Sequence, residues 1–119
     1  MKNSDNLLHR KSYAFSIRII KLSKYLQEEH REYTLARQVL RSGTSIGALV
    51  SESKFAQSPA DFIHKLSIAL KEANETKYWI DLLHDAEYIN QIMHESLYTD
   101  TKELIRLLVT IIKKLKAKQ

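Results

Sequence analysis

Residues 59–86 read PADFIHKLSIALKEANETKYWIDLLHDA, and this stretch decides the fold class. Apolar and small side chains recur in it at alternating spacings of four and three residues, which is the pattern of a helix seam in a bundle or coiled coil. The seam consists of Phe62, Leu66, Ala69, Ala73, Thr76, Ile80 and Leu83. Pro59 suits the first turn of a helix, and Asp61 in that turn complements the helix dipole. The stretch therefore predicts a long helix with one buried face.

Few chain-breaking residues interrupt the rest of the chain. Its 119 residues include 2 glycines and 1 proline, whereas average usage would supply about 8 and about 6. Hairpin-rich β folds need these residues in their turns, so the composition argues against such folds. The length suits one domain with one core. We predict a single all-α domain over residues 1–119, an antiparallel up-and-down four-helix bundle.

Three further helices are predicted. Two of them span residues of about 8–30 and about 33–57, and the last helix ends near residue 117. The last connection lies within residues of about 87–99, where the stop signal is weak. Each helix carries one apolar stripe at helical spacing, which we assign to the core. These stripes are Leu8, Phe15, Ile19, Leu22 and Leu26; Leu35, Val39, Ile46 and Val50; and Leu97, Leu104, Leu108, Ile111 and Leu115.

The helix over about 8–30 has a second apolar stripe, formed by Tyr13, Ile17 and Ile20. This stripe lies roughly 150° around the helix axis from the core stripe. A helix that is apolar on two nearly opposed sides must be covered twice. One cover is the bundle core, and we predict that the other is a second copy of the chain. The three residues are therefore candidates for an oligomer interface.

Both glycines, Gly43 and Gly47, fall inside the predicted helix over about 33–57. Each costs about 1 kcal/mol relative to alanine in a helix interior. The pair marks either a tolerated kink or a place where another backbone approaches closely. We favour the second interpretation and predict a close-packed seam at these two residues.

The chain is basic, with a net charge of +5 and a pI near 9.4. Residues 1–60 hold 10 Lys/Arg and 5 Asp/Glu, while residues 61–119 hold 9 of each. Such an excess either serves solubility alone or attracts a polyanion such as RNA or DNA. Candidate phosphate contacts lie on the first two predicted helices. They are Arg10, Lys11, Arg18 and Lys21, with Arg37 and Arg41 as secondary contacts.

No catalytic or metal-binding motif stands out in the sequence. The chain has no cysteine, which excludes disulfides, thiolate zinc sites and cysteine nucleophiles. The nearest matches to a di-iron motif, Asp61 to His64 and Asp81 to His84, share one helix and place their histidines about 200° apart. We therefore predict no enzymatic activity, no metal and no cofactor, and a metal-dependent oxidase is the enzyme alternative.

Three glutamates, Glu52, Glu72 and Glu75, lie among apolar and small residues of the second and third predicted helices. A buried carboxylate needs a partner, and Arg37 or Arg41 is the natural candidate. We predict a structural polar network that fixes the register of these helices. A catalytic carboxylate is the alternative interpretation.

Membrane and export signals are also missing from the sequence. No apolar run approaches the roughly 20 residues of a membrane span, and the first residues lack the apolar core of a signal peptide. A chain without cysteine fits a reducing compartment. We predict a cytoplasmic protein with no membrane partner.

Three segments of the second and third predicted helices carry a family resemblance. Residues 40–48 read LRSGTSIGA, residues 61–73 read DFIHKLSIALKEA, and residues 75–83 read ETKYWIDLL. Together they resemble the signature of bacterial four-helix-bundle proteins encoded in intervening sequences of 23S ribosomal RNA genes. One position differs, because Leu49 stands where the family commonly has asparagine.

The resemblance implies a ring-like homopentamer. It also implies kinship with the accessory variability determinant protein of diversity-generating retroelements, a basic pentameric bundle that works with a reverse transcriptase and nucleic acid. No enzymatic activity is attached to the family.

Two functions remain open on these grounds. The first is a non-enzymatic homo-oligomeric adaptor that binds RNA or DNA through a basic surface. The second is a protein-interaction scaffold, for example for a reverse transcriptase or another polymerase, without direct nucleic-acid binding. A continuous positive face favours the adaptor, whereas cations paired with Glu and Asp favour the scaffold.

Overall fold

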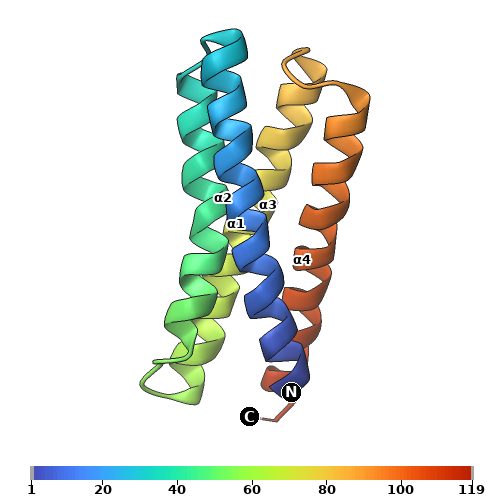
Figure 1. Ribbon diagram of the computed structural model, residues 1–119. Coiled ribbons are helices and arrows are strands. Elements are labelled where there is room, and N and C mark those ends of the chain that lie inside the picture. Colours follow the sequence, from blue (N-terminus) through green and yellow to red (C-terminus); the bar gives the residue numbers. More distant parts are fainter. Residues whose placement is uncertain (1, 119) are drawn as a thin grey trace.

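The computed structural model describes residues 2–118, with side chains from residue 6 onward, and contains four helices and no strand within these residues. The helices are α1 (Lys2–His30), α2 (Thr34–Ser53), α3 (Pro59–Asp85) and α4 (Gln91–Ala117). They run alternately up and down in a rod of 47 × 22 × 19 Å (Figure 1). The prediction of an all-α, four-helix fold is confirmed.

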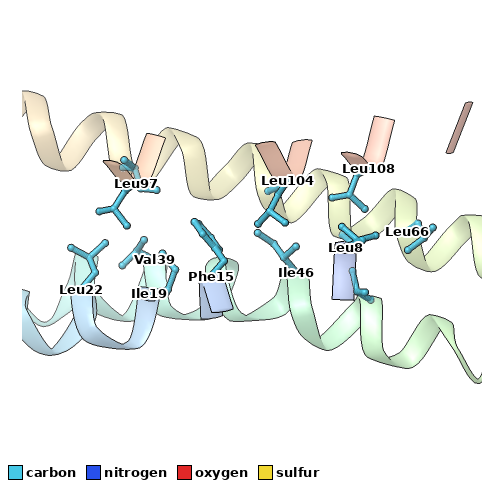
Figure 2. Close-up of a cluster of buried hydrophobic side chains, with 14 of the residues drawn as sticks. Leu8, Phe15, Ile19, Leu22, Val39, Ile46, Leu66, Leu97, Leu104 and Leu108 are labelled. Atoms are coloured by element: carbon cyan, nitrogen blue, oxygen red, sulfur yellow. The ribbon is translucent and has the colours of Figure 1, made fainter. Parts of the chain in front are cut away.

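Each helix packs against two others. α1 lies between α2 and α4, and α3 lies between the same two helices on the other side. The core stripes meet along the bundle axis, where Phe15, Ile46 and Leu104 face one another across the interior (Figure 2). The fully buried members of the α3 seam are Leu66, Ala69, Ala73, Thr76, Ile80 and Leu83, and Phe62 is half-buried. A single core therefore runs the length of the rod.

Side-chain caps set where the second pair of helices begins. Ser58 Oγ accepts a hydrogen bond from the Asp61 backbone N–H at 3.0 Å, and Pro59 occupies the first turn of α3. At α4, Asn90 Oδ1 accepts from the Met93 N–H at 2.8 Å. Asparagine is among the strongest N-cap residues, because its side chain satisfies an N–H group that the first helical turn leaves without a partner.

The structure fixes one helix start that the sequence left open and corrects two predicted boundaries. The last connection, predicted within residues of about 87–99, spans residues 86–90, and α4 begins at Gln91. The N-cap at Asn90 sets this start, since the apolar stripe alone does not reveal a cap. α1 already begins at Lys2, and α2 ends at Ser53 instead of near residue 57.

Two helices end on non-glycine residues in the left-handed backbone region. Arg31 follows α1 with φ of 53°, and Glu87 follows α3 with φ of 69°. After each, a backbone N–H reaches back to close the last turn, from Glu32 to the Leu26 carbonyl at 3.0 Å and from Tyr88 to the Leu83 carbonyl at 2.8 Å. This is the usual position of a helix-ending glycine, yet the two glycines of the chain lie inside α2.

Glycine at position 87 is expected to stabilise the protein. The left-handed conformation costs an L-residue roughly 1–2 kcal/mol, and glycine avoids this cost. Glycine also makes the unfolded chain more flexible, which lowers stability by about 0.5–1 kcal/mol. We expect Glu87→Gly to raise the free energy of unfolding by about 0.5–1 kcal/mol in urea titrations. Glu95→Gly, at an exposed position inside α4, is the control and should lose about 1 kcal/mol. A loss of stability in Glu87→Gly would contradict the backbone assignment.

Candidate interaction surfaces

The outer apolar face of α1 consists of Tyr13, Ile17 and Ile20. Their exposed fractions are 65 %, 44 % and 42 %, although large apolar side chains are usually covered in a small domain. The face lies on the side of α1 away from its core stripe, and all three side chains are exposed. An exposed apolar face of this kind is a candidate contact surface for another molecule.

A hollow of about 350 Å³ lies next to this face, between α1 and α2. Its walls are Tyr13, His9, Ser16, Gly47, Ala48 and Ser51. The small residues of α2 keep it open, because Gly47 and Ala48 place almost no side chain on that surface. His9 Nδ1 is buried there without a hydrogen-bond partner among the described residues. The surface over α1 and α2 thus combines exposed bulky side chains with a space that could accept one.

The two glycines allow α1 and α2 to approach closely. A Cβ at Gly43 would lie 2.7 Å from Ile19 Cγ1, and a Cβ at Gly47 would lie 3.2 Å from the Ser12 carbonyl oxygen. The structure therefore places a buried side chain opposite the first glycine and backbone opposite the second. Ser23 reinforces the same contact, since its hydroxyl donates to the Ala36 carbonyl at 3.1 Å.

The six cations proposed as phosphate contacts fall into two groups. Three of them form ion pairs within the chain. Lys11 Nζ lies 3.0 Å from Glu103 on α4, Arg18 Nη1 lies 2.6 Å from Asp100 on α4, and Arg41 pairs with two glutamates of α3. Arg18 also donates to the Ser96 hydroxyl at 3.0 Å.

The other three candidate cations are Arg10, Lys21 and Arg37. They are exposed and form no ion pair with any side chain in residues 6–118. Of the six predicted contacts, three are thus neutralised by carboxylates and three are exposed without an ion pair among the described residues.

Arg41 is the centre of a polar network between α2 and α3. Its guanidinium binds Glu72 at 3.3 Å and also Glu75, and Trp79 Nε1 donates to Glu75 Oε2 at 2.9 Å. The Trp79 hydrogen bond, followed by the Arg41 contact, outweighs partial burial and lowers the pKa of the Glu75 carboxyl. Glu52 lies apart from this network, exposed and 4.0 Å from Lys65.

Trp79 is not among the residues predicted for this network, so sequence reasoning missed its hydrogen bond to Glu75. The i, i+4 spacing of Glu75 and Trp79 is the signal that could have identified it.

A second polar cluster, also missed, joins α3 to α4. Asp81 binds Lys77 at 3.0 Å and His94 Nε2 at 2.9 Å, and the rings of His84 and His94 stack at 4.4 Å. Partial burial alone would raise the pKa of Asp81, but the hydrogen bonds from His94 and Lys77 hold it below its ordinary value. No group of three or more potential metal ligands occurs among the described residues. The hydrogen bond between His94 and Asp81 joins α4 to α3.

The second half of α4 carries five exposed cations that are not among the predicted phosphate contacts. They are Arg106, Lys113, Lys114, Lys116 and Lys118. None of the five forms an ion pair with a side chain that the structure describes. Their charge is thus available to solvent or to a partner. Within the described residues, no helix is long and apolar enough to cross a bilayer.

Comparison with known protein families decides the family. A model of the 23S rRNA-intervening sequence proteins matches residues 4–110, which is most of the chain. The chain belongs to this family. The resemblance first seen in residues 40–48, 61–73 and 75–83 is confirmed by this match. Leu49, the position that departs from the family pattern, is half-buried and packs against the core.

A solved structure of a relative supports the same assignment. A protein from Bacteroides thetaiotaomicron, described as of unknown function and from the S23 ribosomal protein family, is 52 % identical with a TM-score of 0.91. The match covers 92 % of this chain and 98 % of that one. No curated protein matches the chain. Membership in the intervening sequence family therefore gives the fold without giving a function.

Proposed function

We propose that this intervening sequence protein is a non-enzymatic scaffold that assembles with copies of itself through the outer apolar face of α1. The observation that supports this proposal is the exposure of Tyr13, Ile17 and Ile20 on one side of a helix whose other side is in the core. Covering such side chains contributes roughly 25 cal/mol per Å² of apolar surface removed from water. The ion pairs of Lys11, Arg18 and Arg41 also favour a scaffold over a continuous basic face.

The neighbouring hollow suggests how the copies fit together. Tyr13 projects from the surface beside a space bounded by Gly47 and Ala48, so one copy offers a bulky side chain and the next offers room for it. A contact between different patches of two copies repeats around a ring when the rotation closes. We propose a ring of five, which is the number that the family resemblance implies. The repeated outer surfaces of such a ring would hold a protein partner such as a polymerase.

Sedimentation velocity tests the assembly. We expect the wild-type protein to sediment as an oligomer and the Ile17→Asp, Ile20→Asp double variant to sediment as a monomer, because each carboxylate would be buried without a partner in the interface. Ile92→Asp is the matched control, since Ile92 is 78 % exposed in the first turn of α4, on a different helix from this face. A monomeric wild type, or equal loss of assembly in the control, would reject the proposal.

A nucleic-acid adaptor is the second candidate function. The net charge of +5 and the exposed cations in the second half of α4 favour it, and an assembly multiplies the charge of each copy. Binding of this kind neutralises phosphates and releases counterions, so the affinity falls steeply as salt rises. An affinity for RNA that stays constant between low and high salt would exclude this role.

A further inference from the structure

The fold separates charge along the axis of the bundle. The end that holds both chain termini, the terminal end, is built from residues 2–16, 44–72 and 105–118 (Figure 1). These segments contain 11 Lys/Arg and 4 Asp/Glu, a net charge of +7. The opposite end, the far end, is built from residues 17–43 and 73–104 and contains 8 Lys/Arg and 10 Asp/Glu, a net charge of −2. All of the excess positive charge therefore lies in the terminal end.

The second half of α4 provides the densest part of this charge. Its five exposed cations, defined above, form the α4 cationic surface together with Arg10 of α1. Arg10 is included because it is exposed and lies in the half of α1 that packs against this part of α4, where Lys11 Nζ is 3.0 Å from Glu103. Within residues 6–118, no carboxylate forms an ion pair with any of these six cations.

The helix dipole does not account for this surface. Cations near a helix C-terminus are stabilising only within the last turn, where Lys114 and Lys116 lie. Arg106 and Lys113 lie earlier in α4, on its outward side, and Arg10 lies on another helix. The dipole also gives no reason for the acidic excess at the far end. A partner with many negative charges explains both the number and the position of these cations.

We propose that the α4 cationic surface binds the phosphate backbone of a nucleic acid. Residues 106–118 extend about 18 Å along the helix axis at 1.5 Å per residue, which spans about five phosphates of one duplex strand at 3.4 Å each. The inference rests on the nucleic-acid role given above as the second candidate function. It moves the contacts from the predicted residues of α1 and α2 to the terminal end.

Two triple variants with the same net charge locate the contact. The terminal variant carries Arg106→Gln, Lys113→Gln and Lys114→Gln. The far variant carries Lys21→Gln, Lys24→Gln and Arg37→Gln, which also removes one arginine and two lysines, all exposed. Each variant lowers the formal charge from +5 to +2, so a difference between them reports position and not total charge. Sedimentation and thermal unfolding check that both variants keep the wild-type assembly and fold.

Binding to polyuridylate is measured over a range of salt concentrations. We expect the terminal variant to bind at least about tenfold more weakly than wild type, and the slope of log affinity against log salt to shrink by about 2, at about 0.7 per lost contact on a single strand. The far variant should stay within about twofold of wild type in affinity, with an unchanged slope.

The outcomes separate the location from the function. Equal losses in both variants, or a larger loss in the far variant, would overturn the location while leaving a nucleic-acid role in place. If the wild-type protein had no affinity for polyuridylate, the nucleic-acid role and this inference would both be rejected. The same follows if polyglutamate displaced bound polyuridylate as well as unlabelled polyuridylate does.

Discussion

Alanine at position 43 is expected to destabilise the wild-type protein but to stabilise the Ile19→Ala variant. A Cβ at Gly43 would lie 2.7 Å from Ile19 Cγ1 and 2.8 Å from Ile19 Cγ2. Both atoms are bonded to the branched Cβ of a fully buried side chain, which has little rotamer freedom to move aside. The clash therefore belongs to one pair of residues and disappears when the isoleucine is shortened.

The magnitudes follow from two opposing effects. Overpacking costs about 1–3 kcal/mol, and replacing a mid-helix glycine with alanine gains about 1 kcal/mol. The difference is a loss of up to about 2 kcal/mol for Gly43→Ala in wild type. Ile19→Ala alone should lose about 2–5 kcal/mol. In that background only the helix propensity remains, and Gly43→Ala should gain up to about 1 kcal/mol.

A double-mutant cycle by urea unfolding measures this coupling. All proteins are compared at one concentration, because an assembly makes stability depend on concentration. Gly47→Ala is the control, since its Cβ would meet Ser16 Oγ at 3.0 Å and the Ser12 carbonyl and would not meet Ile19. We expect it to be additive with Ile19→Ala. If the effects of the Gly43 and Ile19 substitutions on the unfolding free energy were additive, the predicted clash between the two side chains would be wrong.

The second large effect is expected at the contact between α1 and α4. Phe15 is 2 % exposed and lies opposite Leu104 in the core (Figure 2). We expect Phe15→Ala to lose about 3–5 kcal/mol of unfolding free energy, because it removes a large buried ring and leaves a cavity. Such a loss is a large part of the roughly 5–15 kcal/mol by which a domain is stable.

Phe55 provides the matched control, because it is 83 % exposed in the connection between α2 and α3. Phe55→Ala should change the unfolding free energy by no more than about 0.5 kcal/mol. Urea midpoints at constant m-value compare the two variants. If both variants lost a similar amount of unfolding free energy, exposed Phe55 would contribute to stability as much as buried Phe15, which would contradict the prediction.

The helices and the core were predictable because apolar spacing reports which side of a helix is buried. Leu66, Ile80 and Leu83 were assigned to the core from spacing alone, and each is buried. The start of α4 was not predictable from this pattern, because the cap at Asn90 is a local hydrogen bond and leaves no mark on apolar periodicity.

The pairing of charged residues depends on which helices become neighbours, and this is why it escaped sequence reasoning. Arg18 and Asp100 are 82 positions apart in the chain, yet they meet because α1 and α4 lie side by side. The charge distribution has the same origin. Divided by sequence, the excess of positive charge falls in residues 1–60. Divided by position in the folded bundle, it falls at the terminal end, because antiparallel helices bring segments from both halves of the chain together.

The even number of helices has a practical consequence for anyone who labels this protein. Both termini lie at the same end of the rod (Figure 1), and this is the end that carries the α4 cationic surface. A fluorophore, an affinity tag or a fused domain at either terminus would therefore stand close to that surface. The connections over residues 31–33 and 86–90 lie at the opposite end of a rod that is 47 Å long. A reporter placed in one of them would leave the terminal end accessible to its partner.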